Sequence, residues 1–260
     1  MRTKISVALD GVELHALDAA IILQSVNEAA PGWNFSAADR AGGLGQRMTG
    51  SQKRYRDIVI QFALDERDPK RRMEILQAVA AWADGARDLT VSYRERQRLR
   101  VTLQGLTPIQ GIEKWGTVYQ ITLRSYSHPM WMDQDETSAA ISGNGSGVLR
   151  IAGNGGGKLC FRAVNSSGSD CASAEVSSGG RTITLTGMEL ASGETLILDY
   201  DAEDIQRIRA GSGSSWRSLL DKRTAASWDD ILLASGENTV AVTSSAALSW
   251  TVYCFGRWIQ

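Results

Sequence analysis

The chain has 260 residues, with 28 Lys and Arg against 29 Asp and Glu, and 43% of its residues are hydrophobic. This composition excludes an intrinsically disordered chain and supplies no basic excess for nucleic-acid binding. The length predicts one or two domains, and we favour two because Met1 to Trp131 carries 18 basic and 14 acidic residues whereas residues 132–260 carry 10 and 15.

The first residues predict neither a leader nor a membrane span. Ile5 to Leu9 is too short for the apolar core of a signal peptide, and no apolar run approaches the roughly 18 residues of a span. Cys160, Cys171 and Cys254 make an odd count without C-x-x-C spacing, which disfavours a zinc site. We therefore expect three reduced cysteines, no metal, no cofactor and folding in a reducing cytoplasm, with a Cys160 to Cys171 bridge as the alternative.

The first elements in chain order are strands. Lys4 to Leu9 and Val12 to Leu14 form a predicted hairpin, because Asp10-Gly11 accepts the positive φ of a two-residue turn. Ala20 to Val26 is a further strand. The segment from Ser36 to Ser51 has no hydrophobic period and is rich in glycine, so it is predicted to be a long mobile loop that binds something or orders on assembly.

One helix is predicted between strands. Asp68 can cap its start, Pro69 suits the first helical position, and Asp84-Gly85 ends it. Ile58 to Leu64 precedes it as a strand, and three strands follow. These are Leu89 to Tyr93, Leu99 to Leu106 and Thr117 to Tyr126. The apolar helix face consists of Met73, Ile75, Leu76, Val79, Ala80, Trp82 and Ala83. The first half is thus predicted to be α+β, with a mostly antiparallel sheet and one helix.

A domain boundary is predicted near residue 130, where Pro129 precedes an acidic run. Short strands between Gly, Ser and Asn turns then indicate a β-sandwich, so the chain as a whole is mainly β. The strands begin at Val148, Lys158, Ala174, Thr182, Thr195 and Ile205, and a terminal pair, Ile231 to Leu233 and Thr239 to Val242, is joined by a turn at Gly236-Glu237-Asn238. Trp250, Tyr253, Phe255 and Trp258 are expected to close the sheet.

Catalytic patterns are weak. Neither His15 nor His128 lies in a catalytic frame, and Gly153 to Lys158 fails the phosphate-loop spacing, so it is interpreted as a turn. Asp199 and Asp201 would share one face of a strand, which is compatible with glycoside hydrolysis or calcium binding. Arg207 and Arg209 are available to neutralise them, so a solvated turn is favoured and we expect no enzyme.

Four arginines recur at every second residue. In a continuous strand Arg94, Arg96, Arg98 and Arg100 would form one basic stripe, but a turn near Glu95 to Gln97 would break it. With Tyr93 the only interleaved aromatic residue, a guarded sheet edge or an ion-paired subunit interface is favoured over nucleic-acid binding.

This order of elements resembles the distal tail protein of long-tailed, non-contractile bacteriophages and their prophages. The residues that carry the resemblance are Gly193 to Asp199, Ser227 to Leu233, Gly236 to Val240 and the last strand near Trp258. The resemblance spans nearly the whole chain and departs from the family between Arg209 and Ala225, where a longer segment replaces a short hairpin.

The resemblance implies a homohexameric ring at the virion tail tip, built in the host bacterial cytoplasm. Residues 1–130 would form the ring that docks onto the tail tube protein, and residues 131–260 a galectin-like platform. The hub protein would bind the opposite face, a receptor-binding or fibre protein is a further partner, and neither nucleic acid nor membrane is engaged. The candidate assembly interface consists of Gly42, Gly43, Leu44, Gly45, Arg47, Arg94, Arg96, Arg98 and Arg100.

Two other functions stay open. A carbohydrate-binding module is suggested by Trp216, Trp228, Trp250 and Trp258 in a galectin-like sandwich, with Trp216 and Trp258 as the candidate glycan contacts, although core packing explains alternate-position tryptophans more simply. A glycan-cleaving tail enzyme would depend on Asp199 and Asp201 alone.

Overall fold

The computed structural model describes residues 5–39, 46–53, 55–112, 116–126, 129–201 and 204–259, and for 33–39, 46–53, 110–112 and 116 it describes the backbone alone. The chain divides into two compact units, unit 1 (Met1–Trp131) and unit 2 (Met132–Ile259). Strands dominate both, and the described ranges contain a single α-helix. The predicted mainly β fold class is confirmed.

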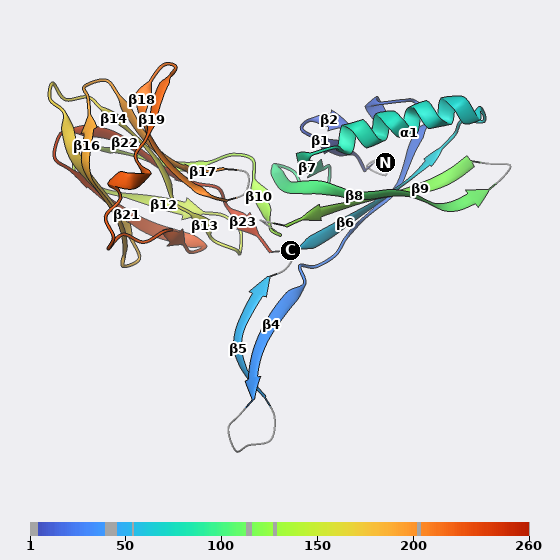
Figure 1. Ribbon diagram of the computed structural model, residues 1–260, viewed down its shortest axis with the longest axis horizontal. Coiled ribbons are helices and arrows are strands. Elements are labelled where there is room, and N and C mark those ends of the chain that lie inside the picture. The colour runs from blue at the N-terminus through green and yellow to red at the C-terminus, as the bar shows by residue number, and fades with distance from the viewer. Residues whose placement is uncertain are drawn as a thin grey trace. The chain divides into compact units, whose positions relative to one another are not determined.

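Unit 1 has an antiparallel sheet in the order β2-β1-β7-β8-β9-β6-β3, with α1 lying over one face (Figure 1). Its elements are β1 (Val7–Leu9), β2 (Val12–Glu13), η1 (Leu14–Ala16), β3 (Ile21–Glu28), β4 (Trp33–Asp39), β5 (Gln46–Lys53), β6 (Arg56–Leu64), α1 (Pro69–Ala83), β7 (Ala86–Val91), β8 (Gln97–Ile112) and β9 (Gly116–Ser125). β10 (Trp131–Asp133) contains the boundary to unit 2.

The β1–β2 hairpin is the predicted one. Asp10 and Gly11 have φ values of 48° and 81°, which is the positive-φ pair of a two-residue hairpin turn. Ala8 pairs with Glu13 and Leu9 with Val12. The turn chemistry therefore fixes the register of these strands.

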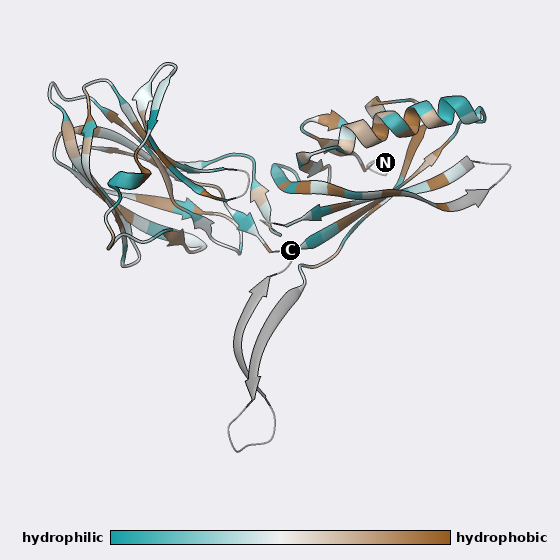
Figure 2. Ribbon diagram, in the orientation of Figure 1, coloured by the Kyte–Doolittle hydropathy of each residue, from teal (hydrophilic) through white to brown (hydrophobic). Residues whose placement is uncertain are grey.

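The core of unit 1 lies between α1 and one sheet face. Along β6 every second side chain is buried, from Ile58 through Phe62 to Leu64. From α1, four residues are buried against this face: Ile75, Val79, Trp82 and Ala83. Met73, which was predicted to belong to the apolar helix face, is 57% exposed, so this prediction is wrong. Met73 follows Lys70, Arg71 and Arg72 in the sequence, and the first turns of α1 are coloured as hydrophilic in Figure 2, so few apolar residues are available there for burial.

Both predicted helix ends are confirmed. The Asp68 carboxylate accepts a hydrogen bond from the Lys70 backbone N–H at 3.0 Å, and Pro69 is the first helical residue. Asp84 is the C-cap, and Gly85 follows with φ 76°. Gly85 therefore turns the chain out of the helix in the left-handed conformation that glycine tolerates.

The sheet face opposite α1 mixes polar side chains with small apolar ones. Gln61 lies across from Gln120, and Val59 lies across from Thr122. The Ser25 hydroxyl donates to the Gln61 side-chain oxygen at 3.2 Å. Such small and polar side chains suit contact with water, so no helix is needed on this face.

The predicted loop from Ser36 to Ser51 is wrong for its described part. β4 and β5 pair as an antiparallel hairpin in which Phe35 lies across from Ser51 and Ser36 from Gly50, with a bulge between Ser36 and Ala37. The glycine and the bulge hide the alternation that identifies strands, so the sequence pattern predicts a loop. Gly42, Gly43, Leu44 and Gly45 lie outside the described residues.

Unit 2 is a β-sandwich of a six-stranded and a four-stranded sheet, in the orders β11-β22-β14-β17-β18-β19 and β12-β21-β15-β16. Its strands are β11 (Thr137–Ser142), β12 (Gly145–Ile151), β13 (Gly157–Lys158), β14 (Cys160–Asn165), β15 (Cys171–Ser178), β16 (Arg181–Leu190), β17 (Thr195–Tyr200), β18 (Gln206–Ser212), β19 (Ser215–Ser218), β20 (Leu232–Leu233), β21 (Gly236–Ser244), β22 (Leu248–Cys254) and β23 (Arg257–Trp258). A short 3-10 helix, η2, spans Leu220–Lys222.

The sandwich core is apolar and aromatic. Phe161 and Trp250 meet edge-on with ring centroids 5.5 Å apart, among buried Leu149, Leu198 and Val240. Trp250 is 1% exposed, which confirms core packing for this residue. All three cysteines are buried and free, so the Cys160 to Cys171 bridge does not form.

The terminal strand pair differs from the prediction. β20 pairs with β13, where Gly157 lies across from Leu233, whereas β21 pairs with β12 and β15. The expected turn residue Asn238 lies inside β21, and its side chain donates to the Ala234 carbonyl at 2.8 Å and accepts from the Ala234 N–H at 2.9 Å. Asn238, which was expected in a turn, therefore hydrogen-bonds the loop that precedes β21. β20 and β21 do not pair with each other as a hairpin.

The Gly153 to Lys158 run is a packing element and not a phosphate loop. A Cβ added at Gly157 would overlap the Cys254 sulfur, and one at Gly153 would overlap the Arg257 carbonyl oxygen. The Lys158 ammonium group instead binds Asp204 at 2.7 Å and Asp230 at 3.0 Å. These glycines therefore allow two backbone segments to approach closely.

Candidate assembly interface and binding surfaces

The four arginines do not form one stripe. Arg94 and Arg96 lie in the turn between β7 and β8, where Arg96 has φ 61°, and only Arg98 and Arg100 lie on β8. The turn near Glu95 to Gln97 thus breaks the stripe, as the alternative interpretation expected. Asp88 binds both strand arginines, with distances of 3.2 Å to Arg98 Nη1 and 3.2 Å to Arg100 Nη1.

Arg94 belongs to a cluster around Glu28. The Glu28 carboxylate accepts hydrogen bonds from Arg94 Nη2 at 2.8 Å, from the Tyr93 hydroxyl at 2.7 Å and from Trp131 Nε1 at 3.0 Å. The Arg94 guanidinium also lies 4.8 Å from the Trp131 ring centroid. This Glu28 cluster ties the end of β3 to the β7–β8 turn and to the last residue of unit 1.

The charges of the cluster shift its ionisation. Burial raises the pKa of Glu28, but the hydrogen bonds from Arg94 and Tyr93 outweigh burial and hold the pKa below its ordinary value of 4.5. Burial and the nearby Glu28 carboxylate raise the pKa of Tyr93 above its ordinary range. Sequence patterns missed Glu28 and Trp131, because their partners are 66 and 103 residues away in the chain.

Arg96 differs from the other three arginines. Its side chain is exposed at the tip of the β7–β8 turn, and it forms no ion pair among the described residues. Arg47 lies in β5, where the structure describes the backbone alone. Of the candidate assembly arginines with described side chains, Arg96 is therefore the one whose charge is not already compensated.

A second arginine cluster in unit 1 combines charge with aromatic rings. Arg124 binds Asp57 in bidentate fashion, with Nε–Oδ1 at 2.6 Å and Nη2–Oδ2 at 2.9 Å. Its guanidinium lies 3.7 Å from the Tyr55 ring centroid and 5.8 Å from that of Tyr126, and the hydrogen bond to Asp57 raises the pKa of Arg124. Tyr126 is 57% exposed, so this cluster displays aromatic surface that strand patterns alone do not predict.

The two candidate glycan tryptophans have local partners. Trp216 is 41% exposed, but its Nε1 donates to the Gly213 carbonyl at 3.0 Å and the Arg209 guanidinium lies 5.2 Å from its ring centroid. Trp258 is half-buried and donates to Asp133 Oδ1 at 2.7 Å. Both indole N–H groups are therefore used within unit 2.

Asp199 and Asp201 have structural roles. Asp199 accepts from Arg207 Nε at 3.1 Å and from Arg209 Nη2 at 2.9 Å, as the neutralising arrangement predicted. Asp201 accepts from the Ile205 backbone N–H at 2.9 Å. One carboxylate thus forms an ion-paired group on the sheet and the other holds a turn.

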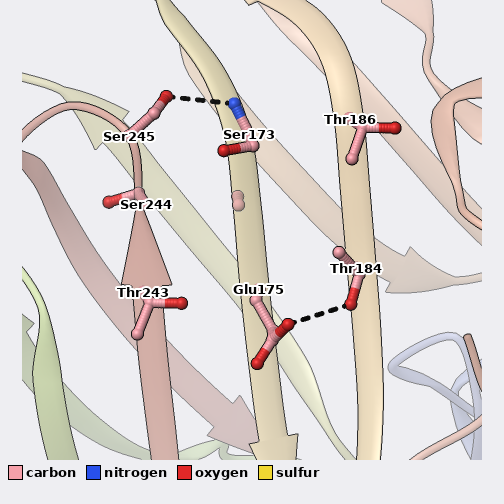
Figure 3. A pocket seen from close by; sticks show the side chains of 8 residues that line it. Ser173, Glu175, Thr184, Thr186, Thr243, Ser244 and Ser245 are labelled. Atoms are coloured by element: carbon pink, nitrogen blue, oxygen red, sulfur yellow. Dashed lines mark hydrogen bonds between the residues drawn. The ribbon is translucent and has the colours of Figure 1, made fainter.

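A shallow hollow of about 360 Å³ lies on the four-stranded sheet of unit 2 (Figure 3). It is lined by Ser173, Ala174, Glu175, Thr184, Thr186, Thr243, Ser244 and Ser245. The Thr184 hydroxyl donates to Glu175 Oε2 at 3.1 Å. We name it the hydroxyl hollow; no sequence motif marks it, since its residues come from three separate strands.

The described residues provide neither a metal cluster nor a membrane-spanning helix. Within the described ranges, no three His, Cys, Asp or Glu side chains gather closely enough to hold a metal ion. No helix in the described part of the chain is long and apolar enough to cross a membrane. His128 lies outside the described residues, and the exposed His15 contacts Glu13 at 2.9 Å.

Neither family models nor curated proteins match the chain, but solved structures do. The SPP1 Dit (gp 19.1) protein, a paradigm of the hub adsorption apparatus in phages that infect Gram-positive bacteria, aligns with a TM-score of 0.72 and 13% identity over 98% of this chain and 99% of that chain. A chain of the phage P2 baseplate in its activated conformation with Ca aligns with a TM-score of 0.54 and 8% identity, over 97% of this chain and 97% of that chain. The same baseplate with Sr gives a TM-score of 0.53 and 9% identity, over 96% of this chain and 97% of that chain. This chain therefore has the fold of the SPP1 Dit protein over nearly its whole length.

Proposed function

We propose that the chain is a distal tail protein of a long-tailed phage or prophage, a structural component of the virion tail tip. The observation that carries the proposal is the match to SPP1 Dit across 98% of this chain and 99% of that one, which leaves neither unit without a counterpart. In this proposal the protein forms a hexameric ring that joins the tail tube to the hub and to the host-recognition apparatus. It folds in the host cytoplasm and then joins the virion.

The edges of the unit 1 sheet support a ring. β3 lies at one end of the strand order and the two-residue β2 at the other, so the N–H and C=O groups on one side of β3 have no strand partner among the described elements. Ile22 on β3 is 50% exposed. Edge-to-edge contact between copies would cover such strands, and a closed ring leaves no edge free.

The sheet face opposite α1 supports the same arrangement. Polar and apolar side chains intermix on it, with Gln61 and Gln120 between Val59 and Val118, so it offers a neighbour no continuous apolar patch to bury. We infer that copies meet through the sheet edges and the β7–β8 turn, where Arg96 is exposed, while this face stays in water. Residues 42–45 and Arg47 remain candidates for the same interface.

Unit 2 is proposed as the platform for a receptor-binding or fibre protein. The sandwich buries its own inner faces, so the exposed parts of its outer faces can bind a partner while the unit keeps its fold. Because Asp199 is bound by two arginines and Asp201 holds a turn, we propose no catalytic role for these carboxylates. The protein would act through binding and assembly alone.

The proposal is tested by measuring the mass of the purified full chain by light scattering and native mass spectrometry, with negative-stain imaging of the same sample. We expect the mass to rise with concentration toward six copies and the images to show rings with a central opening. A protein that stays a single chain at every concentration, with and without tail tube and hub proteins, would contradict the proposal.

A further inference from the structure

The hydroxyl hollow presents side chains that the fold does not require. In β15 and β16 the inward residues Ala174, Val176 and Leu185 are buried in the sandwich core, so the alternate residues must point outward. Thr243, Glu175 and Thr184 lie directly across from one another on three adjacent strands. The outer face thus carries a carboxylate flanked by hydroxyls in one row.

Glu175 is the only ionisable residue of the lining, and its bonding capacity is mostly unused. It accepts one hydrogen bond, from Thr184, and no Lys or Arg of the described ranges forms an ion pair with it. A carboxylate can accept about four hydrogen bonds. Glu175 therefore offers acceptor positions to a ligand that is rich in donors.

The surrounding hydroxyls are partly fixed in place. The Ser245 hydroxyl oxygen accepts the backbone N–H groups of Ala172 at 2.9 Å and Ser173 at 3.1 Å, which holds the rim of the hydroxyl hollow. The side-chain hydroxyls of Ser173, Thr186 and Thr243 form no hydrogen bond within the described residues, so they can donate or accept freely (Figure 3). The rim of the hydroxyl hollow is thus tied to the backbone, while most of its other hydroxyls face solvent and can exchange water for a ligand.

The lining selects the class of ligand. Phosphate and nucleic acid would be repelled by the Glu175 carboxylate, because the lining contains no Lys or Arg to offset its charge. An apolar ligand would displace water from the hydroxyls and leave them without hydrogen-bond partners. A volume of about 360 Å³ lies at the lower end of the range for small-molecule sites, about 300–1,000 Å³. A neutral saccharide supplies both donors and acceptors at this size.

We propose that the hydroxyl hollow binds a neutral saccharide, with Glu175 accepting hydrogen bonds from sugar hydroxyls and Thr184, Thr243 and Ser173 completing the contacts. The site is distinct from Trp216 and Trp258, and it does not depend on the ring. No aromatic residue lines it, so hydrophobic stacking does not contribute and binding is weak, with a dissociation constant in the millimolar range.

The test is a titration of the isotope-labelled full chain with glucose, galactose, N-acetylglucosamine and rhamnose, followed by two-dimensional NMR. At least one sugar should produce saturable shifts at Ser173, Glu175, Thr184 and Thr243. Glu175→Gln should weaken binding about tenfold, because a charge-assisted hydrogen bond is lost. Glu237→Gln is the matched control, since Glu237 is an exposed carboxylate on β21 outside the lining and pairs with Arg150.

Thr184→Val provides a second variant of nearly the same shape, which should also weaken binding while the unfolding free energy stays close to that of the parent, because the Thr184 side chain lies on the outer surface of the sheet. The proposal is overturned if no sugar gives saturable shifts, if the shifts map to Trp216 or Trp258, or if Glu175→Gln and Thr184→Val bind as the parent does. The proposal is also overturned if putrescine produces the shifts and no sugar does, because Glu175 would then bind an amine. None of these results bears on the oligomeric state.

Discussion

The two units bury their sheets differently. In unit 1 a single helix covers one face, and the exposed edge strand β3 ends the sheet. In unit 2 two sheets cover each other, and one apolar cluster runs through both. Both units keep edge strands, but unit 2 covers an inner face of each sheet within a single copy, whereas unit 1 has only one helix over one face and ends at β3, the edge that we propose meets a neighbouring copy.

The difference separates two kinds of residue. Core residues of unit 2 should control the stability of that unit and leave assembly unchanged, because they lie inside the sandwich. Edge residues of unit 1 should control assembly and leave stability nearly unchanged, because they face solvent in a single copy. Substitutions in the two units test this separation.

The largest expected effect is in the unit 2 core. Trp250→Ala should lower the free energy of unfolding by about 3–5 kcal/mol, because it empties a fully buried site beside Phe161. Denaturant unfolding of the full chain should show the loss in one transition. Trp250→Phe is the control and should cost less, since the Trp250 Nε1 is buried without a hydrogen-bond partner in the described structure and phenylalanine removes that donor.

Glu28→Gln should cost about 2 kcal/mol, in the range for hydrogen bonds to charged groups. The pKa of Glu28 is lowered in the folded state, so its contribution is complete at pH values above the ordinary 4.5 and is lost as the pH falls through the folded-state pKa. The difference in unfolding free energy between the parent and Glu28→Gln should therefore shrink below about pH 4.5. If the difference in unfolding free energy stays constant down to pH 2, the ionised Glu28 carboxylate does not stabilise the cluster. Glu13→Gln, which changes a carboxylate that is more exposed, is the control.

The next effect is on assembly. Ile22→Lys places a charge on the exposed edge of β3 and should weaken self-association about tenfold or more, which is about 1.4 kcal/mol. The unfolding free energy of a single copy should change by no more than about 0.5 kcal/mol. Val148→Lys is matched to it, since Val148 is 52% exposed on β12, an edge strand of unit 2. Equal weakening by both variants would contradict the assignment of assembly to unit 1.

The smallest effect concerns the helix start. Asp68→Ala removes the side chain that accepts the Lys70 N–H and should lower the stability of unit 1 by about 1 kcal/mol. Asp68→Asn keeps an acceptor and should restore most of it. Thermal unfolding followed by circular dichroism at the helix wavelength measures both variants.

Local signals account for what the sequence predicted well. The Asp10-Gly11 turn, the Asp68-Pro69 helix start and the alternation of β6 depend on neighbouring residues, so they can be read from short windows. The β4–β5 hairpin and the pairing of β20 with β13 depend on distant backbone contacts, and there the patterns failed. Gly153 and Gly157 are residues typical of turns but allow close backbone packing, and Asn238 is also typical of turns but hydrogen-bonds Ala234.

The candidate sites were harder to predict for the same reason. The alternating arginines suggested a stripe, but a positive-φ residue at Arg96 divides them between a turn and a strand. The Glu28 cluster and the hydroxyl hollow combine residues that are far apart in the sequence, with partners fixed by strand register. Register follows from the packing of whole sheets, and a single sequence does not display it.

Amide hydrogen exchange in dilute protein, compared with exchange in assembled protein, locates the contact between copies. We expect new protection in β3 and in the β7–β8 turn on assembly, with exchange in the sandwich strands of unit 2 unchanged. Protection confined to unit 2, or assembly without any new protection in β3, would contradict the claim that copies meet through the open edge of unit 1.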